Sequence, residues 1–212
     1  MIHPELWAWA ALFLLGAYHG INPAMGWLFA VALGLQKQSG RAVWQSLLPI
    51  AMGHALAISL VILVAVLAGA VLPLRVMKIC VVVVLIGFGV YRLIGKSHPR
   101  WGGMQVGFRD LTIWSFLMAS AHGAGFMLLP VLLGLSAIDG GHAMHSMNSP
   151  GIGVQFFAIA IHTFGYLVLT GTIAWVTYKW VGLSLLRKAW LNLDLVWAVA
   201  LIATAGVTLL IS

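Results

Sequence analysis

Charged residues are scarce in this chain of 212 residues, and acidic residues are the scarcest of all. Lys and Arg number 11 and Asp and Glu only 4, which makes 7% of the sequence charged, whereas a soluble domain carries about 25%. Hydrophobic residues make up 62%. This composition argues against a water-soluble fold. It also leaves no soluble basic surface for a nucleic acid, despite the formal net charge of +7. The single cysteine, Cys80, excludes an internal disulfide framework and any CxxC motif.

Long apolar runs recur from one end of the sequence to the other. In hydrocarbon every backbone polar group needs an internal partner, so each run is predicted to be a helix. We therefore expect an all-α polytopic membrane protein, with residues 1–212 forming one transmembrane domain of six helices. The six predicted spans are Leu6–Leu35, Leu47–Leu72, Leu74–Tyr91, Leu111–Leu135, Val154–Tyr178 and Ala189–Ile211.

The positive charges between these spans predict the orientation of the chain. Loops on the cytoplasmic side of a membrane carry an excess of Lys and Arg. The first, third and fifth loops carry Lys37, Arg41, Arg92, Lys96, Arg100, Arg109, Lys179, Arg187 and Lys188, whereas the second carries Arg75 and Lys78 and the fourth carries neither type. The bias places both termini outside and the odd-numbered loops against anionic lipid in the cytoplasm. We expect the membrane to be a bacterial inner membrane.

Polar residues inside the spans are the best indicators of function, because their burial in hydrocarbon is costly. The first span contains the sequence His19-Gly-Ile-Asn-Pro-Ala-Met25, in which the proline removes a backbone donor and predicts a kink or break. The fourth span contains His122-Gly, followed by Met127. The second and fifth spans carry His54 and His162. Any one of these histidines is most simply explained by a hydrogen bond to a nearby carbonyl, but four on four spans favour a shared site.

The distribution of these motifs also suggests an internal repeat. Each half of the chain, 1–95 and 110–212, has a His-Gly pair on its first span and a histidine on its second. Because each half has three spans, the two halves would have opposite orientations in the membrane. Inverted repeats of this kind place a substrate site at the midplane, between broken helices.

The predicted external loop between the fourth and fifth spans has an unusual composition. It combines turn-forming Gly, Ser, Asn and Pro, which favour a flexible linker, with four donors of the imidazole and thioether type. Such donors suit copper, and imidazole also suits nickel or zinc, so the loop could capture a metal ion at the periphery. The four donors are His142, Met144, His145 and Met147.

The first-span motif and the Met52-Gly53-His54 segment resemble the first- and second-helix signatures of small nickel/cobalt transporters and the related urease-accessory-type permeases. The six-span layout resembles the wider lysine-exporter superfamily of compact carriers with a three-helix repeat. The resemblance implies that His19, Pro23 and His54 match the corresponding motif positions. It departs from the motif at Ala24 and Met25, where the nickel/cobalt proteins have Asp and a second His. A thioether in place of imidazole would shift the preference toward a softer ion such as Cu(I).

These patterns lead to one main hypothesis, a transition-metal permease without enzymatic activity. Its substrate would be Ni, Co or Cu, not a permanently bound cofactor, and an external metal-binding protein could deliver or receive the ion. Two alternatives stay open: a membrane electron carrier in which transmembrane histidines ligate haem b, and an exporter of an amino acid or other small solute. The predicted central site consists of His19, Asn22, Met25, His54, His122, Met127 and His162.

Overall fold

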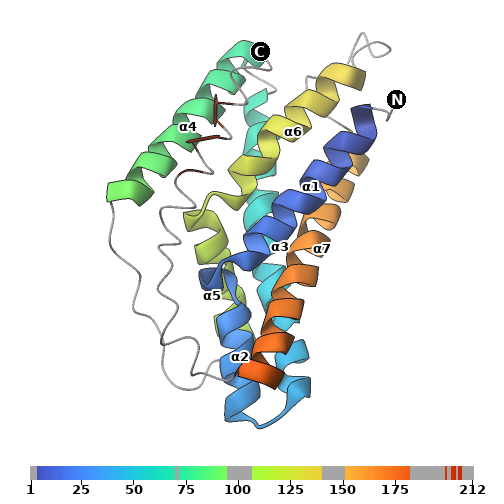
Figure 1. Cartoon of the computed structure of the whole chain (residues 1–212). Coiled ribbons are helices and arrows are strands. Elements are labelled where there is room, and N and C mark those ends of the chain that lie inside the picture. The colour runs from blue at the N-terminus through green and yellow to red at the C-terminus, as the bar shows by residue number, and fades with distance from the viewer. Residues whose placement is uncertain are drawn as a thin grey trace.

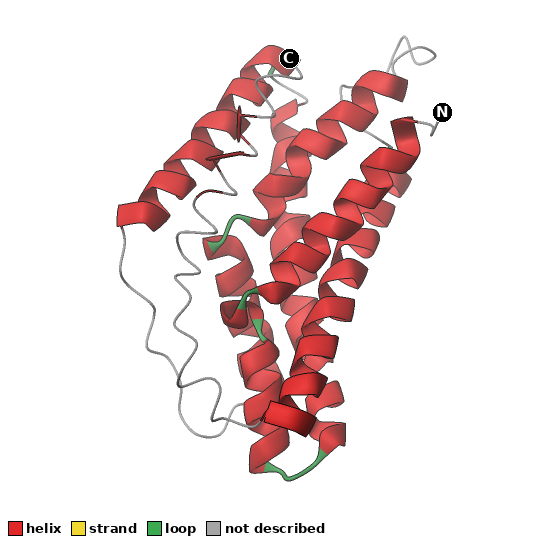
Figure 2. Cartoon of the chain, viewed as in Figure 1, coloured by secondary structure: helices red, strands yellow, loops and turns green. Residues whose placement is uncertain are grey.

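A computed structural model of the chain describes residues 4–69, 72–94, 107–139 and 151–181, together with 199, 202, 203, 205 and 206. Within these ranges the chain forms helices connected by short turns, with no strand (Figure 2). The predicted all-α fold is therefore confirmed for the described residues. The external loop with its four predicted donors, and nearly all of the sixth predicted span, lie outside them.

The described helices follow the predicted apolar segments, with some differences in their bounds. The third and fifth predicted spans each correspond to one long helix, and the second begins earlier than predicted, at Gly40. The first and fourth are each divided into two helices. In order, the elements are α1 (Pro4–Ile21), η1 (Pro23–Met25), α2 (Trp27–Gln36), α3 (Gly40–Gly69), α4 (Leu74–Ile94), α5 (Phe108–Ala121), α6 (Ala124–Asp139), α7 (Ile152–Val176) and η2 (Thr177–Val181).

Two of the described helices are long and apolar enough to cross a membrane. They cover Gly40–Ala68 and Ile152–Trp180. A third candidate is the pair Phe108–Ala121 and Ala124–Leu132, if the two helices form one span bent by 58°. The protein is thus α-helical, with two or three described helices able to span a membrane.

On the longest helix, α3, the exposed face is apolar, whereas a helix of a water-soluble protein exposes polar side chains. One face carries large apolar side chains about one turn apart that are half exposed, and the opposite face is buried and includes His54 at 0% exposure. In water such a continuous apolar stripe would promote aggregation, whereas in a bilayer it faces lipid. The exposed stripe consists of Trp44, Leu48, Met52, Leu56, Leu60, Leu63 and Leu67.

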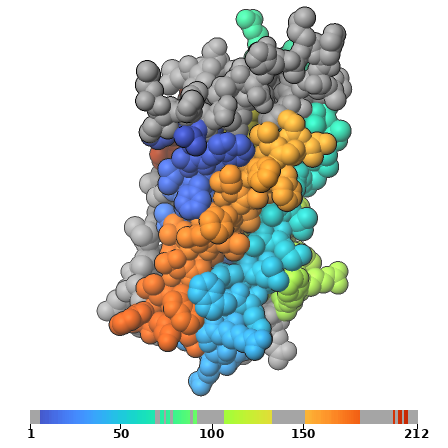
Figure 3. Space-filling model, turned by 90° about the vertical axis from the view of Figure 1, so that its right-hand side faces the viewer, coloured from blue at the N-terminus to red at the C-terminus, as the bar shows by residue number. Residues whose placement is uncertain are grey.

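The helices form an elongated bundle (Figure 1). In it, helices from the first half of the sequence pack most extensively on helices from the second half. The most extensive packing joins α1 to α7 and α3 to α5. α1 and α7 both run downward in Figure 1, whereas α3, α5 and α6 run upward. The face shown in Figure 3 has α1, α7 and α3 lying side by side. Segments more than 140 residues apart, such as Leu12 and His162, therefore meet in the interior.

Candidate functional site

The break predicted at Pro23 is confirmed, and its local structure follows from the sequence. α1 ends at Ile21, and the Asn22 side chain caps the next turn by accepting a hydrogen bond from the Ala24 amide at 2.9 Å. Pro23 occupies the first position of η1, where a missing N–H costs nothing. Gly26 then adopts a φ of 131°, a conformation that only glycine adopts readily, and α2 begins at the next residue.

Two carbonyls freed by this break receive hydrogen bonds from side chains. The Trp27 indole donates to the Ile21 carbonyl at 3.0 Å, and the Tyr166 hydroxyl donates to the Met25 carbonyl. The Asn22 carbonyl accepts the Met25 amide at 2.9 Å. Because buried carbonyls need partners, these bonds stabilise the break without any ion.

The fourth predicted span is also divided into two helices, a break that was not predicted from the sequence. α5 ends at Ala121, His122 forms its C-cap, and Gly123 has a φ of 70° before α6 begins. A glycine in this left-handed conformation is the commonest way to end a helix, so the His122-Gly123 pair was a usable signal. Both broken spans thus have a His-Gly pair at or near the end of their first helix.

Glycines on α1 and α7 allow these two helices to approach until their backbones touch. A Cβ atom added at Gly16 would overlap the His162 carbonyl, and one added at Gly165 would overlap the Phe13 carbonyl. Gly53 on α3 makes an equally close contact with α5, at the Thr112 carbonyl. Small residues at crossings are typical of membrane helices, where van der Waals contact drives association. Here these crossings determine the level along the bundle at which histidines of different helices meet.

Three of the four predicted histidines come together in the core, and we call His19, His54 and His162 the three-histidine cluster. Each is 0% exposed. The ring centroid of His19 lies 5.2 Å from that of His162 and 5.8 Å from that of His54. The rings of His54 and His162 are nearly parallel, with centroids 5.5 Å apart. The three imidazoles belong to α1, α3 and α7, and therefore to both halves of the sequence.

The hydrogen bonds of two cluster members define their tautomers. His19 Nδ1 lies 2.9 Å from the Leu15 carbonyl, and His162 Nδ1 lies 3.2 Å from the Leu12 carbonyl. A carbonyl can only accept, so Nδ1 carries the proton in both rings, and in a neutral imidazole the lone pair is on Nε2. This is the arrangement seen in metal-binding histidines, in which the second nitrogen donates to an orienting carbonyl or carboxylate.

Buried nitrogens without partners occur in the same cluster. Among the described residues, three ring nitrogens of the cluster have no hydrogen-bond partner: both nitrogens of His54 and Nε2 of His162. A buried polar atom of this kind costs free energy, and such atoms commonly mark a binding site. Even so, no group of three or more His, Cys, Asp or Glu side chains in the described ranges has a geometry suited to hold a metal ion.

The other predicted ligands occupy different surroundings. Asn22 uses its side-chain oxygen to cap η1. Met25 is buried in the main core, whereas Met127 belongs to a second cluster with Val82 and Leu85 of α4. His122 is 1% exposed at the second break, and its Nδ1 lies 2.8 Å from the Met118 carbonyl. His142, Met144, His145 and Met147 lie outside the described residues.

Tyr166 belongs to the site but was not predicted from the sequence. It is 0% exposed, its ring stacks on His54 with centroids 4.0 Å apart, and its hydroxyl donates to Met25 at the first break. The available signal was its spacing, because Tyr166 follows His162 by four residues and so shares its helix face.

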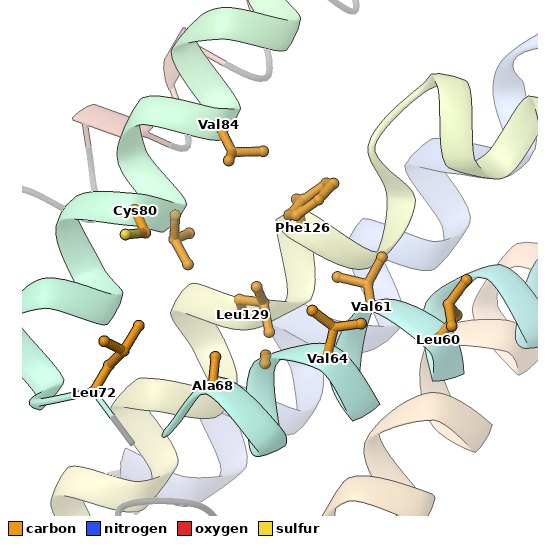
Figure 4. A pocket seen from close by; sticks show the side chains of 11 residues that line it. Leu60, Val61, Val64, Ala68, Leu72, Cys80, Val84, Phe126 and Leu129 are labelled. Carbon is orange, nitrogen blue, oxygen red and sulfur yellow. The ribbon is translucent and has the colours of Figure 1, made fainter. Parts of the chain in front are cut away.

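A separate pocket lies between α3, α4 and α6 (Figure 4). Its side chains are aliphatic or aromatic except for Cys80, the single cysteine. It includes none of the predicted ligands. The lining consists of Leu60, Val61, Val64, Ala65, Ala68, Leu72, Cys80, Val81, Val84, Phe126 and Leu129.

Comparison with known proteins gives no relative, since no family model, curated protein or solved structure matches this chain. The resemblance to nickel/cobalt permeases therefore rests on the short motifs around His19 and His54.

Proposed function

We propose that this protein is a transition-metal permease whose substrate ion passes through the three-histidine cluster. The observation that carries the proposal is the close approach of three fully buried imidazoles from three different helices. Intramembrane ionisable residues of this kind typically mark substrate or ion pathways. Neutral imidazoles can replace the water of a transition-metal ion without adding a fixed charge, which favours release as well as binding.

The ring separations approach those expected around one shared ion, although the described side chains as they stand form no group that could hold one. With metal–nitrogen bonds of about 2.0–2.1 Å, imidazoles arranged tetrahedrally around one ion have centroids roughly 5 Å apart. The three observed separations are 5.2, 5.5 and 5.8 Å. Binding of one ion by all three rings would then require the side chains to rearrange. His162 and His19 would each bind through Nε2, with the backbone carbonyl on Nδ1 as the orienting partner.

The proposed topology is six spans arranged as two inverted repeats, with both termini outside. It is supported by the reciprocal packing of α1 on α7 and of α3 on α5, and by a His-Gly break in one span of each half. In both breaks the histidine Nδ1 lies within 3 Å of the carbonyl four residues earlier. The turn between α2 and α3, which contains Lys37, and η2, which contains Lys179, lie at one end of the bundle (Figure 1), in agreement with the charge bias. Broken helices are the usual setting of a midplane substrate site.

Metal binding by purified variants tests the proposal. We expect the wild-type protein in detergent to bind Co²⁺ or Ni²⁺. Loss of a residue that only orients a metal ligand weakens binding by about 10- to 100-fold. His54→Phe and His162→Gln remove ligands themselves, so each should weaken binding by more than this. His54→Phe keeps an aromatic ring beside Tyr166. The matched control is His98→Gln, since His98 lies outside all six predicted spans. Ion uptake into proteoliposomes should follow the same order. Equal binding by all four proteins would refute the proposal.

The same preparation distinguishes the two alternatives. A Soret band that shifts on reduction would identify a haem protein, although imidazole rings already in mutual contact leave no space between them for a porphyrin. Uptake or release of amino acids without any metal flux would identify a solute exporter.

A further inference from the structure

His54 differs from the other two members of the three-histidine cluster in what orients its ring. His19 and His162 each have Nδ1 on a backbone carbonyl, whereas neither nitrogen of His54 has a hydrogen-bond partner among the described residues. An imidazole without such a bond can rotate about its side-chain torsions unless packing prevents it. Its orientation must therefore come from the side chains that touch it.

The contact that restrains His54 most closely is with Tyr166. The two rings are stacked, with centroids 4.0 Å apart and planes inclined by 10°. The His162 ring, one turn earlier on α7, is also nearly parallel to His54, at an angle of 4°. α7 thus presents two rings, four residues apart, that both lie parallel to the single imidazole supplied by α3.

Tyr166 is itself held at both ends. Its ring is 0% exposed and belongs to the main core, and its hydroxyl donates to the Met25 carbonyl in η1. The backbone on its own helix is in contact with α1, since a Cβ atom at Gly16 would lie 3.0 Å from the Tyr166 amide nitrogen. A ring fixed in this way is a rigid surface for a neighbouring imidazole.

We propose that Tyr166 is the positioning residue that orients His54 in the metal site, a role that rests on the proposed function. In most metal sites a hydrogen bond to the second ring nitrogen does this work. Here the stacked phenol ring replaces it, so that either nitrogen of His54 can carry the lone pair that binds the ion. The hydroxyl anchors the phenol ring to the first helix break and does not touch the imidazole nitrogens.

The proposal separates the contribution of the ring from that of the hydroxyl. Tyr166→Phe keeps the ring and removes the hydroxyl, so its Co²⁺ affinity should fall less than that of either variant without the ring. Tyr166→Leu removes the ring, and an aromatic contact of this type corresponds to a loss of roughly 2- to 10-fold in affinity. Its Co²⁺ visible absorption spectrum should also change, because the position of a ligand changes. Tyr166→Met, whose flexible side chain fills a comparable volume, serves as a second variant without a ring.

Tyr178→Phe is the matched control, because it makes the same change in η2, the segment that directly follows α7 and lies outside the three-histidine cluster. We expect it to leave affinity and spectrum unchanged. Wild-type affinity and spectrum in both Tyr166→Leu and Tyr166→Met would overturn the proposal. A loss in Tyr166→Phe as large as in Tyr166→Leu would also overturn it, because the hydroxyl would then matter and not the ring. Absence of Co²⁺ binding by the wild-type protein would instead refute the proposed function.

Discussion

Replacement of Gly16 by alanine should destabilise the α1–α7 contact on which the three-histidine cluster depends. The added Cβ atom would overlap the His162 carbonyl oxygen and would lie 2.8 Å from the carbon of that carbonyl and 3.0 Å from the Tyr166 amide nitrogen. All three atoms belong to the backbone of α7, so no side chain can move aside. Favourable contacts between heavy atoms require about 3.5–4.0 Å, so the two helices must separate by roughly 1 Å or more.

Two opposing effects determine the size of the change. Overpacking of a well-packed interior costs about 1–3 kcal/mol, and an overlap with backbone favours the upper part of this range. Alanine has a higher helix propensity than glycine, which recovers at most about 1 kcal/mol. The free energy of unfolding should therefore fall by about 1–2 kcal/mol. The same separation would move His19 away from His162, so metal affinity should fall as well.

Gly87→Ala is the matched control, because Gly87 lies within α4 and an added Cβ atom there meets nothing within 4 Å. This variant should gain up to about 1 kcal/mol from helix propensity alone. Thermal unfolding in detergent, followed by circular dichroism, should then show Gly16→Ala melting roughly 2–12 °C below Gly87→Ala, at about 2–4 °C for each kcal/mol. A Gly16→Ala protein that melts at or above the control would contradict the close approach of α1 and α7.

Three further changes test the first helix break and the ligand chemistry. Asn22→Ala removes the cap on the Ala24 amide and should lower the free energy of unfolding by about 1 kcal/mol, measured by chemical denaturation. Gly26→Ala must adopt a φ of 131° and place a Cβ atom 2.7 Å from an Ile50 methyl group, so it should be the least stable variant of the break in the same assay. Because imidazole binds metal only when deprotonated, Co²⁺ affinity measured by titration calorimetry should fall by about tenfold per pH unit for each proton displaced as the pH is lowered. A Co²⁺ affinity that rises as the pH is lowered would contradict histidine ligands.

The local features of the fold could be predicted from sequence because they depend on neighbouring residues. Apolar runs predicted helices, and Pro23 predicted the first break, both of which the described residues confirm. The break in the fourth predicted span, where Gly123 adopts the left-handed conformation, was not predicted. The role of Asn22 as a cap was also missed, although Asn before Pro is a common start of a helical turn.

By itself the sequence determined the class of the protein: an apolar chain with few charges forms helices, which satisfy its backbone hydrogen bonds internally, and two or three of the described helices are able to span a membrane. It also supplied four histidines within predicted spans. Only the tertiary structure decided which of them meet. Their contact depends on the crossing of α1 with α7, segments nearly 150 residues apart, where Gly16 and Gly165 permit an approach that no local pattern encodes. The same crossing places Tyr166 against His54, because stacking is set by the register between helices and not by the spacing along one of them.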